Sequence, residues 1–141
     1  MRRLPLMLFA AAALAGCAAD MGPPPQRTAK QEDTLRRALA GKVAERPVSC
    51  LPTYRQSNME VVDDYTILFH DGSSRVYLQS PAGGCHPLGS GSYTLVTNIH
   101  NPSGTLCSGD ISRVVDLSGS RMTVGSCAMS DFVPYVTPGR G

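Results

Sequence analysis

The chain has 141 residues, with 13 basic side chains, 11 acidic side chains, five cysteines and no tryptophan. This length suits one domain with a short extension. Two of the basic residues are Arg2 and Arg3, so the rest of the chain carries 11 basic and 11 acidic residues, a balance that argues against a nucleic-acid partner and against a polybasic patch for anionic lipid.

Residues 1–16 are typical of a secretory signal peptide. Two arginines precede an apolar run over residues 4–15, which is shorter than the roughly 20 residues needed to cross a bilayer. The sequence LAGC at residues 14–17 resembles the bacterial lipobox. The resemblance implies that the signal peptide is removed, that the thiol of Cys17 receives a diacylglycerol and that its amine can be acylated. An ordinary cleavage site within AAALA, residues 11–15, is the alternative.

The residues after Cys17 predict a membrane-tethered protein of the cell envelope. Ala18 resembles the pattern of lipoproteins exported to the outer membrane, so we expect an anchor there and a domain that faces the periplasm. Residues 17–27 include three consecutive prolines and predict a semi-rigid tether. Residues 28–141 then form a single domain.

A short helix is predicted at the start of this domain. Thr28 and Gln31 have the spacing of a capping box. One apolar stripe follows, and Pro47 is expected to end the helix; the stripe consists of Leu35, Ala38, Leu39 and Val43. The narrow stripe favours a helix on one side of a sheet, and a helix for a partner protein is the alternative.

From Val48 onward, short runs rich in β-branched and aromatic residues predict strands. One hairpin should turn at Asp71-Gly72 with a loop of two or four residues. Either loop places one apolar set toward the core and leaves the other face partly wet; the core set is Tyr65, Ile67, Phe69, Val76 and Leu78.

A second hairpin should turn at residues 118–120, where Ile111, Val115, Leu117, Met122 and Val124 supply apolar side chains. Further strands are expected near residues 93–98 and 131–136, with weaker ones near 48–51 and 58–62. The sequence predicts an α+β fold, with one helix and a mainly antiparallel small barrel or sandwich of six to eight strands.

Four cysteines remain for this domain, and they contain no C-x-x-C pair. An exported domain of this size is expected to oxidise them into two disulfides, for which three connectivities exist. We favour the nested pairing, Cys50–Cys127 with Cys85–Cys107, because the outer bridge would tie the first strand to the last.

Five segments together resemble a family of small Gram-negative exported proteins and lipoproteins that is known as a domain of unknown function. In order they are LAGKVAERPVSCL, DDYTILFHDGSSRVYLQ, GCHPL, LCSGD and SCAMSDFVPY, and they span residues 39–135. The resemblance supports the disulfides and implies no activity, substrate or partner.

The sequence predicts neither a metal site nor a cofactor. His70, His86 and His100 stand apart, without H-x-H or H-x-x-x-H spacing. Asp110 in LCSGD is expected to cap a turn, and a functional carboxylate is the alternative. A hydrolase would require two or three of His86, Asp110 and Asp131 to converge in a pocket.

We therefore expect a non-catalytic binding or accessory module, anchored to the membrane, with an envelope protein or peptidoglycan as its partner. A tethered enzyme inhibitor is the alternative, with residues 86–92 as the loop that would enter a target. A small hydrolase is the third hypothesis.

Overall fold

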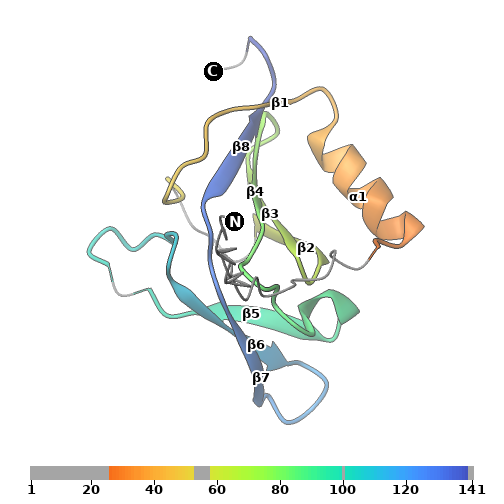
Figure 1. Ribbon diagram of the computed structural model, residues 1–141, viewed down its shortest axis with the longest axis vertical. Coiled ribbons are helices and arrows are strands. Elements are labelled where there is room, and N and C mark those ends of the chain that lie inside the picture. Colours follow the sequence, from red (N-terminus) through yellow and green to blue (C-terminus); the bar gives the residue numbers. More distant parts are fainter. Residues whose placement is uncertain (1–25, 53–57, 100, 140–141) are drawn as a thin grey trace, which may run out of the picture.

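The computed structural model describes residues 26–52, 58–99 and 101–139. Within these ranges one N-terminal helix accompanies eight strands in two antiparallel sheets, which confirms the predicted α+β class with a sandwich-like arrangement (Figure 1). The elements are α1 (Ala29–Leu39), β1 (Val43–Ala44), β2 (Met59–Asp63), β3 (Thr66–Asp71), β4 (Arg75–Gln79), the 3-10 turn η2 (Leu88–Ser90), β5 (Tyr93–Thr97), β6 (Ile111–Asp116), β7 (Thr123–Ala128) and β8 (Phe132–Val136).

The larger sheet has the strand order β1-β8-β4-β3-β2, and the smaller has the order β5-β6-β7. The main core is built by side chains from both sheets, and its largest fully buried member is Phe132. The ring of Phe132 meets that of Phe69 edge to face, with centroids 5.8 Å apart. Within the described ranges, no helix has the length and apolar character needed to span a membrane.

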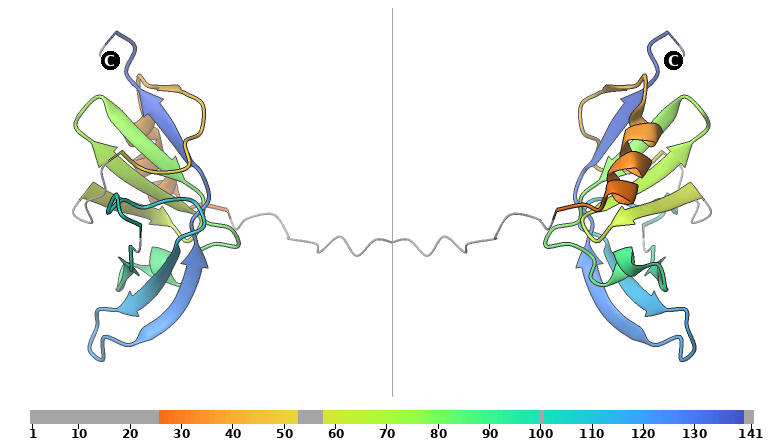
Figure 2. Two further views of the ribbon diagram at one scale, coloured as in Figure 1. Left: turned by 90° about the vertical axis from the view of Figure 1, so that its left-hand side faces the viewer. Right: turned by 90° about the vertical axis from the view of Figure 1, so that its right-hand side faces the viewer.

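Helix α1 covers the other face of the larger sheet, as predicted (Figure 2). Its capping box is confirmed, since Gln31 N–H donates to the Thr28 hydroxyl while the Thr28 N–H donates to the Gln31 side chain. The apolar stripe packs on Val62, Leu68 and Val76. The expected extent of the helix is wrong, however.

The helix ends at Leu39, well before Pro47. Ala40 leaves the helical region and Gly41 adopts a left-handed conformation, with φ of 70°. Val43 therefore belongs to β1, where it pairs with Val136 of β8.

The hairpin of β3 and β4 is confirmed, as is the core face of β3, but the predicted faces of β4 are wrong. Asp71 pairs with Arg75, so the loop has three residues, and Gly72 supplies a left-handed conformation at φ of 68°. Compared with a loop of two or four residues, a loop of three residues moves each side chain of β4 to the opposite face relative to β3. Phe69 consequently pairs with Tyr77, and both point into the main core, while Leu68 and Val76 lie beneath the helix.

All four cysteines of the domain form disulfides, but the nested pairing, Cys50–Cys127 with Cys85–Cys107, is wrong. The bonds join Cys50 to Cys107 and Cys85 to Cys127, and we call this pair the crossed disulfides. The segments of Cys50 and Cys107 run side by side as an antiparallel bridge. This pairing is set by the way the two segments meet in the fold, which the separation along the chain does not reveal.

The remaining strand predictions are confirmed in most places. Strands occur at 59–63, 93–97 and 132–136, and the second hairpin is formed by β6 and β7. The weak strand expected near 48–51 is reduced to isolated bridges at Val48 and Cys50. In the second hairpin, Val114 and Cys127 face the main core, whereas Ile111, Leu117, Met122 and Val124 are exposed.

Candidate functional site

Of the residues that a hydrolase would have needed, His86 and Asp110 bond to different partners. Asp110 caps its turn, because its Oδ2 accepts the N–H of Cys107 at 2.8 Å. His70 lies 2.8 Å from Oε2 of Glu60 on the neighbouring strand. His86 meets Asp64, a carboxylate that the sequence analysis did not single out. Cys17 and His100 lie outside the described residues, and within the described ranges no three potential ligands form a metal site.

A polar cluster forms where the turn between β2 and β3 meets the segment after Cys85. Nδ1 of His86 is 2.6 Å from Oδ2 of Asp64, and Nε2 is 3.0 Å from the hydroxyl of Tyr65. The N–H of Gly89 donates to Oδ1 of Asp64 at 2.6 Å. The carboxylate therefore holds the imidazole at one nitrogen, and the phenol engages the other.

Backbone contacts hold this cluster together. The Cys85 N–H donates to the carbonyl of Asp64 at 2.7 Å, which brings the two segments together. A Cβ at Gly84 would lie 2.8 Å from Cε1 of Tyr65, and one at Gly89 would lie 2.8 Å from the Asp64 nitrogen. The glycines at these two positions thus permit a close approach that other residues would block.

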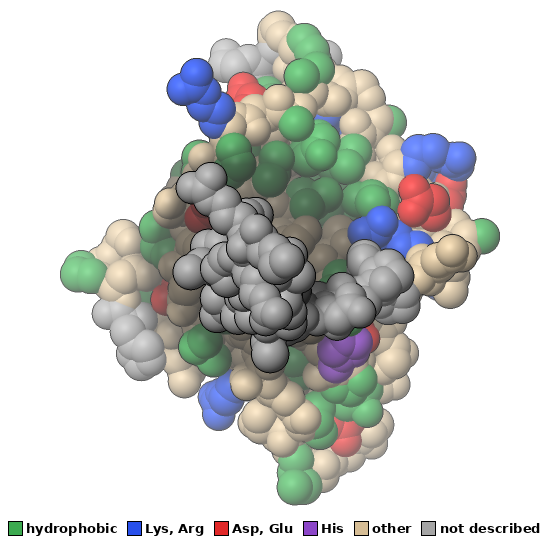
Figure 3. Space-filling view, viewed as in Figure 1, with side chains coloured by type: hydrophobic (Ala, Val, Ile, Leu, Met, Phe, Trp, Pro, Cys, Tyr) green, Lys and Arg blue, Asp and Glu red, His purple; other side chains and the backbone are tan. Residues whose placement is uncertain are grey.

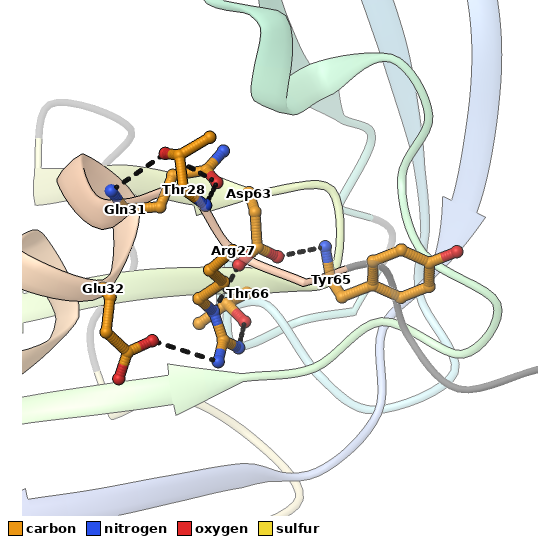
Figure 4. A network of polar contacts seen from close by, with 7 residues as sticks. All are labelled: Arg27, Thr28, Gln31, Glu32, Asp63, Tyr65 and Thr66. Atoms are coloured by element: carbon orange, nitrogen blue, oxygen red, sulfur yellow. Dashed lines mark hydrogen bonds and ion pairs between the residues drawn. The ribbon is translucent and has the colours of Figure 1, made fainter.

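A second polar network adjoins the cluster and secures the entry of the chain into the domain. Figure 4 shows Arg27, at the end of the predicted tether, reaching Oδ2 of Asp63 at 2.6 Å and the hydroxyl of Thr66 at 2.6 Å. Asp63 also accepts the Tyr65 N–H at 2.7 Å. A cleft of about 230 Å³ lies here, lined in part by Gln26 and Asp64.

The chemistry of the polar cluster favours a structural role. A carboxylate–imidazole pair is the arrangement of a general base, and the His86 side chain is 54% exposed. The nitrogen that would take a proton from a substrate is engaged by Tyr65 instead. The cluster therefore braces the β2–β3 turn against η2, beside the point where the tether joins the domain.

The loop at residues 86–92, considered for an inhibitor, is folded onto the domain. Leu88 in η2 is almost completely buried, and the turn packs against β2 and β5. The Ser90 hydroxyl donates back to the Pro87 carbonyl at 3.0 Å. Leu88 therefore anchors this segment, while His86, Ser90, Gly91 and Ser92 remain exposed.

An apolar surface lies on the β6–β7 hairpin. Among the described residues, five large hydrophobic side chains are exposed, and four of them belong to this hairpin: Ile111, Leu117, Met122 and Val124. Leu117 is 57% exposed and Met122 is 63% exposed, and both lie in the connection between the strands. Leu117 and Met122 flank the same turn, while Ile111 lies at the other end of the hairpin, opposite Ala128. Exposed apolar patches mark interaction surfaces.

Asp116, the acidic residue next to this surface, points its carboxylate toward its own loop. The carboxylate of Asp116 accepts the hydroxyl of Ser118 at 2.6 Å and its N–H at 2.8 Å. These two bonds lower the pKa of Asp116, and a bond from the Ser120 hydroxyl adds to the effect. The loop thereby bonds its carboxylate locally, and Leu117, Arg121 and Met122 are exposed around it.

A comparison of the chain with protein-family models, with curated proteins and with solved structures found no match.

Proposed function

We propose that the protein is a lipid-anchored, non-catalytic binding module of the bacterial cell envelope. The lipobox-like LAGC sequence supports an anchor at Cys17, and Ala18 after it supports placement in the outer membrane, facing the periplasm. The two disulfides fit an oxidising compartment outside the cytoplasm. The Pro-rich residues 17–27 act as the tether that carries the domain.

The observation that carries the binding role is the apolar hairpin. Leu95, Leu106 and Phe132 are completely buried in this domain. Leu117 and Met122, in contrast, are more than half exposed. Leaving such side chains in water costs free energy, since each would contribute about 1.5–3 kcal/mol if fully buried. We infer that the outer side of the β6–β7 hairpin is the contact surface of the module.

Site-specific photo-crosslinking in intact envelopes tests this role. A photoreactive side chain at Met122 should yield crosslinked products, whereas the same group at Val43, 59% exposed on β1, should yield few. Equal yields at the two positions would contradict the assigned surface. His86→Ala should leave the yield at position 122 unchanged, because the polar cluster serves as a brace in this proposal.

Processing tests the anchor separately. The wild-type protein should carry acyl mass on Cys17 and fractionate with the outer membrane. Cys17→Ser should prevent acylation and cleavage by the lipoprotein signal peptidase. A mature protein with an unmodified thiol at residue 17 would overturn the anchor.

A further inference from the structure

The connection between β6 and β7, residues 117–122, forms one extremity of the molecule. It lies at the lower end of the longest axis, opposite the C-terminal end of β8 (Figure 1). In the space-filling view this end terminates in hydrophobic side chains (Figure 3). We call residues 117–122 the hairpin tip.

We propose that the hairpin tip inserts into the surface of a phospholipid bilayer, as a second attachment beside the lipid on Cys17. This inference rests on the proposed function, since it identifies what the contact surface of the module binds. Leu117 and Met122 would enter the boundary between headgroups and acyl chains, where apolar side chains gain from leaving water.

The internal bonding of the tip suits this environment. The Asp116 N–H donates to the Met122 carbonyl at 3.0 Å, and the Leu117 N–H donates to the Ser92 carbonyl at 2.9 Å. The Asp116 carboxylate accepts hydrogen bonds from the N–H and the hydroxyl of Ser118. Polar groups that are already bonded within the protein cost less to move toward hydrocarbon than unbonded ones.

Arg121 is a second, independent observation at the same place. Its φ of 51° makes it the one residue other than glycine with a positive φ among the described residues. An L-residue pays roughly 1–2 kcal/mol in this conformation, and such outliers cluster at functional positions. Beside Met122, the guanidinium can reach phosphate oxygens while its apolar stem follows the side chains inward.

The size and charge of the tip favour a bilayer over a folded protein. Stable protein interfaces bury roughly 800 Å² on each partner, whereas the tip presents two prominent apolar side chains on one narrow turn. A bilayer needs no complementary shape. The three strands of the smaller sheet and the hairpin tip carry Arg113, Asp116 and Arg121 as their charges, so no large repulsion from anionic headgroups opposes the contact.

The tether permits the geometry. The nine residues from Ala18 to Gln26 can extend to about 30 Å at most. Anchoring at Cys17 therefore keeps the domain near the membrane surface. A tip with modest intrinsic affinity is then presented at a high local concentration.

The lack of tryptophan in the chain allows a direct test. The mature chain from residue 17, with Cys17→Ser to remove the lipid, is prepared with Met122→Trp and mixed with vesicles of phosphatidylethanolamine and phosphatidylglycerol. Its fluorescence should shift to the blue and be quenched by brominated acyl chains. Val43→Trp, at a position of 59% exposure near the other end of the molecule, should show neither change.

A second variant measures the contribution of the tip. Leu117→Ser combined with Met122→Ser should reduce partitioning into these vesicles about tenfold, with an unchanged thermal midpoint because both side chains are exposed. Unchanged fluorescence of Met122→Trp, or equal responses at positions 122 and 43, would overturn the inference. Crosslinking from position 122 to a protein, without vesicle binding, would also overturn it while the proposed function stood. Failure of acylation at Cys17 would overturn the anchor alone.

Discussion

Gly125, in the middle of β7, should tolerate no larger residue, and Gly125→Ala tests the packing of β7 against the segment after Cys85. A Cβ at this position would lie 2.6 Å from the carbonyl oxygen of His86. Ordinary contacts of this kind begin near 3.4 Å, so the backbone would have to move by several tenths of an ångström. The carbonyl cannot retreat easily, because Cys85 is joined by its disulfide to Cys127, two residues from the substitution.

Overpacking of this kind costs about 1–3 kcal/mol. For a domain of about 100 residues, 2 kcal/mol corresponds to a fall of roughly 10 °C in Tm. Gly119→Ala is the matched control, since a Cβ there meets nothing within 4 Å and the backbone needs no positive φ. Its Tm should stay within a few degrees of the wild type. Equal Tm values for the two variants, measured by calorimetry on the oxidised protein, would refute the close approach at Gly125.

Three further predictions follow from the loops and the cysteines. Peptide mapping without reduction should recover the crossed disulfides, and a peptide linking Cys50 to Cys127 would contradict them. Asp110→Ala should cost about 1 kcal/mol of unfolding free energy, as lost caps do, while Asp110→Asn should retain most of it; equal losses in denaturant titrations would argue against a cap. Asp116 should titrate below its ordinary value of 3.8 in carboxyl NMR spectra, and Ser118→Ala should raise that midpoint. Because folding lowers this pKa, its contribution to stability is present above pH 3.8 and is lost as the pH falls through the folded-state value.

In this interpretation the polar cluster stabilises the domain, and the hairpin tip binds. Asp64, Tyr65 and His86 stabilise the region where the tether enters, next to the bonds that Arg27 makes with Asp63. The tip bonds to the segment after η2 through the Leu117 N–H and the Ser92 carbonyl, and in this proposal it carries the contact surface. A substitution in the brace should therefore act through stability, whereas a substitution in the tip should act through binding.

The sequence by itself determined the features that depend on neighbouring residues. The capping box of Thr28 and Gln31 needs atoms three positions apart, and the structure has both of its bonds. The Asp110 cap likewise spans three residues, from the carboxylate to the Cys107 N–H. The hairpins at residues 66–79 and 111–128 were located because turn-forming residues separate runs of strand-forming ones.

Tertiary structure decided the features that join distant segments. One residue in the length of the β3–β4 loop exchanged the two faces of β4 relative to β3. Tyr77 therefore points into the main core, and Val76 lies beneath the helix with Leu68. His86 contacts Asp64, 22 residues earlier in the chain, because backbone bonds bring the two segments together. No pattern of neighbouring residues indicates this contact. The exposure of Leu117 and Met122 has the same origin, since an apolar side chain is buried only when other elements fold over it, and none of the described elements covers the hairpin tip.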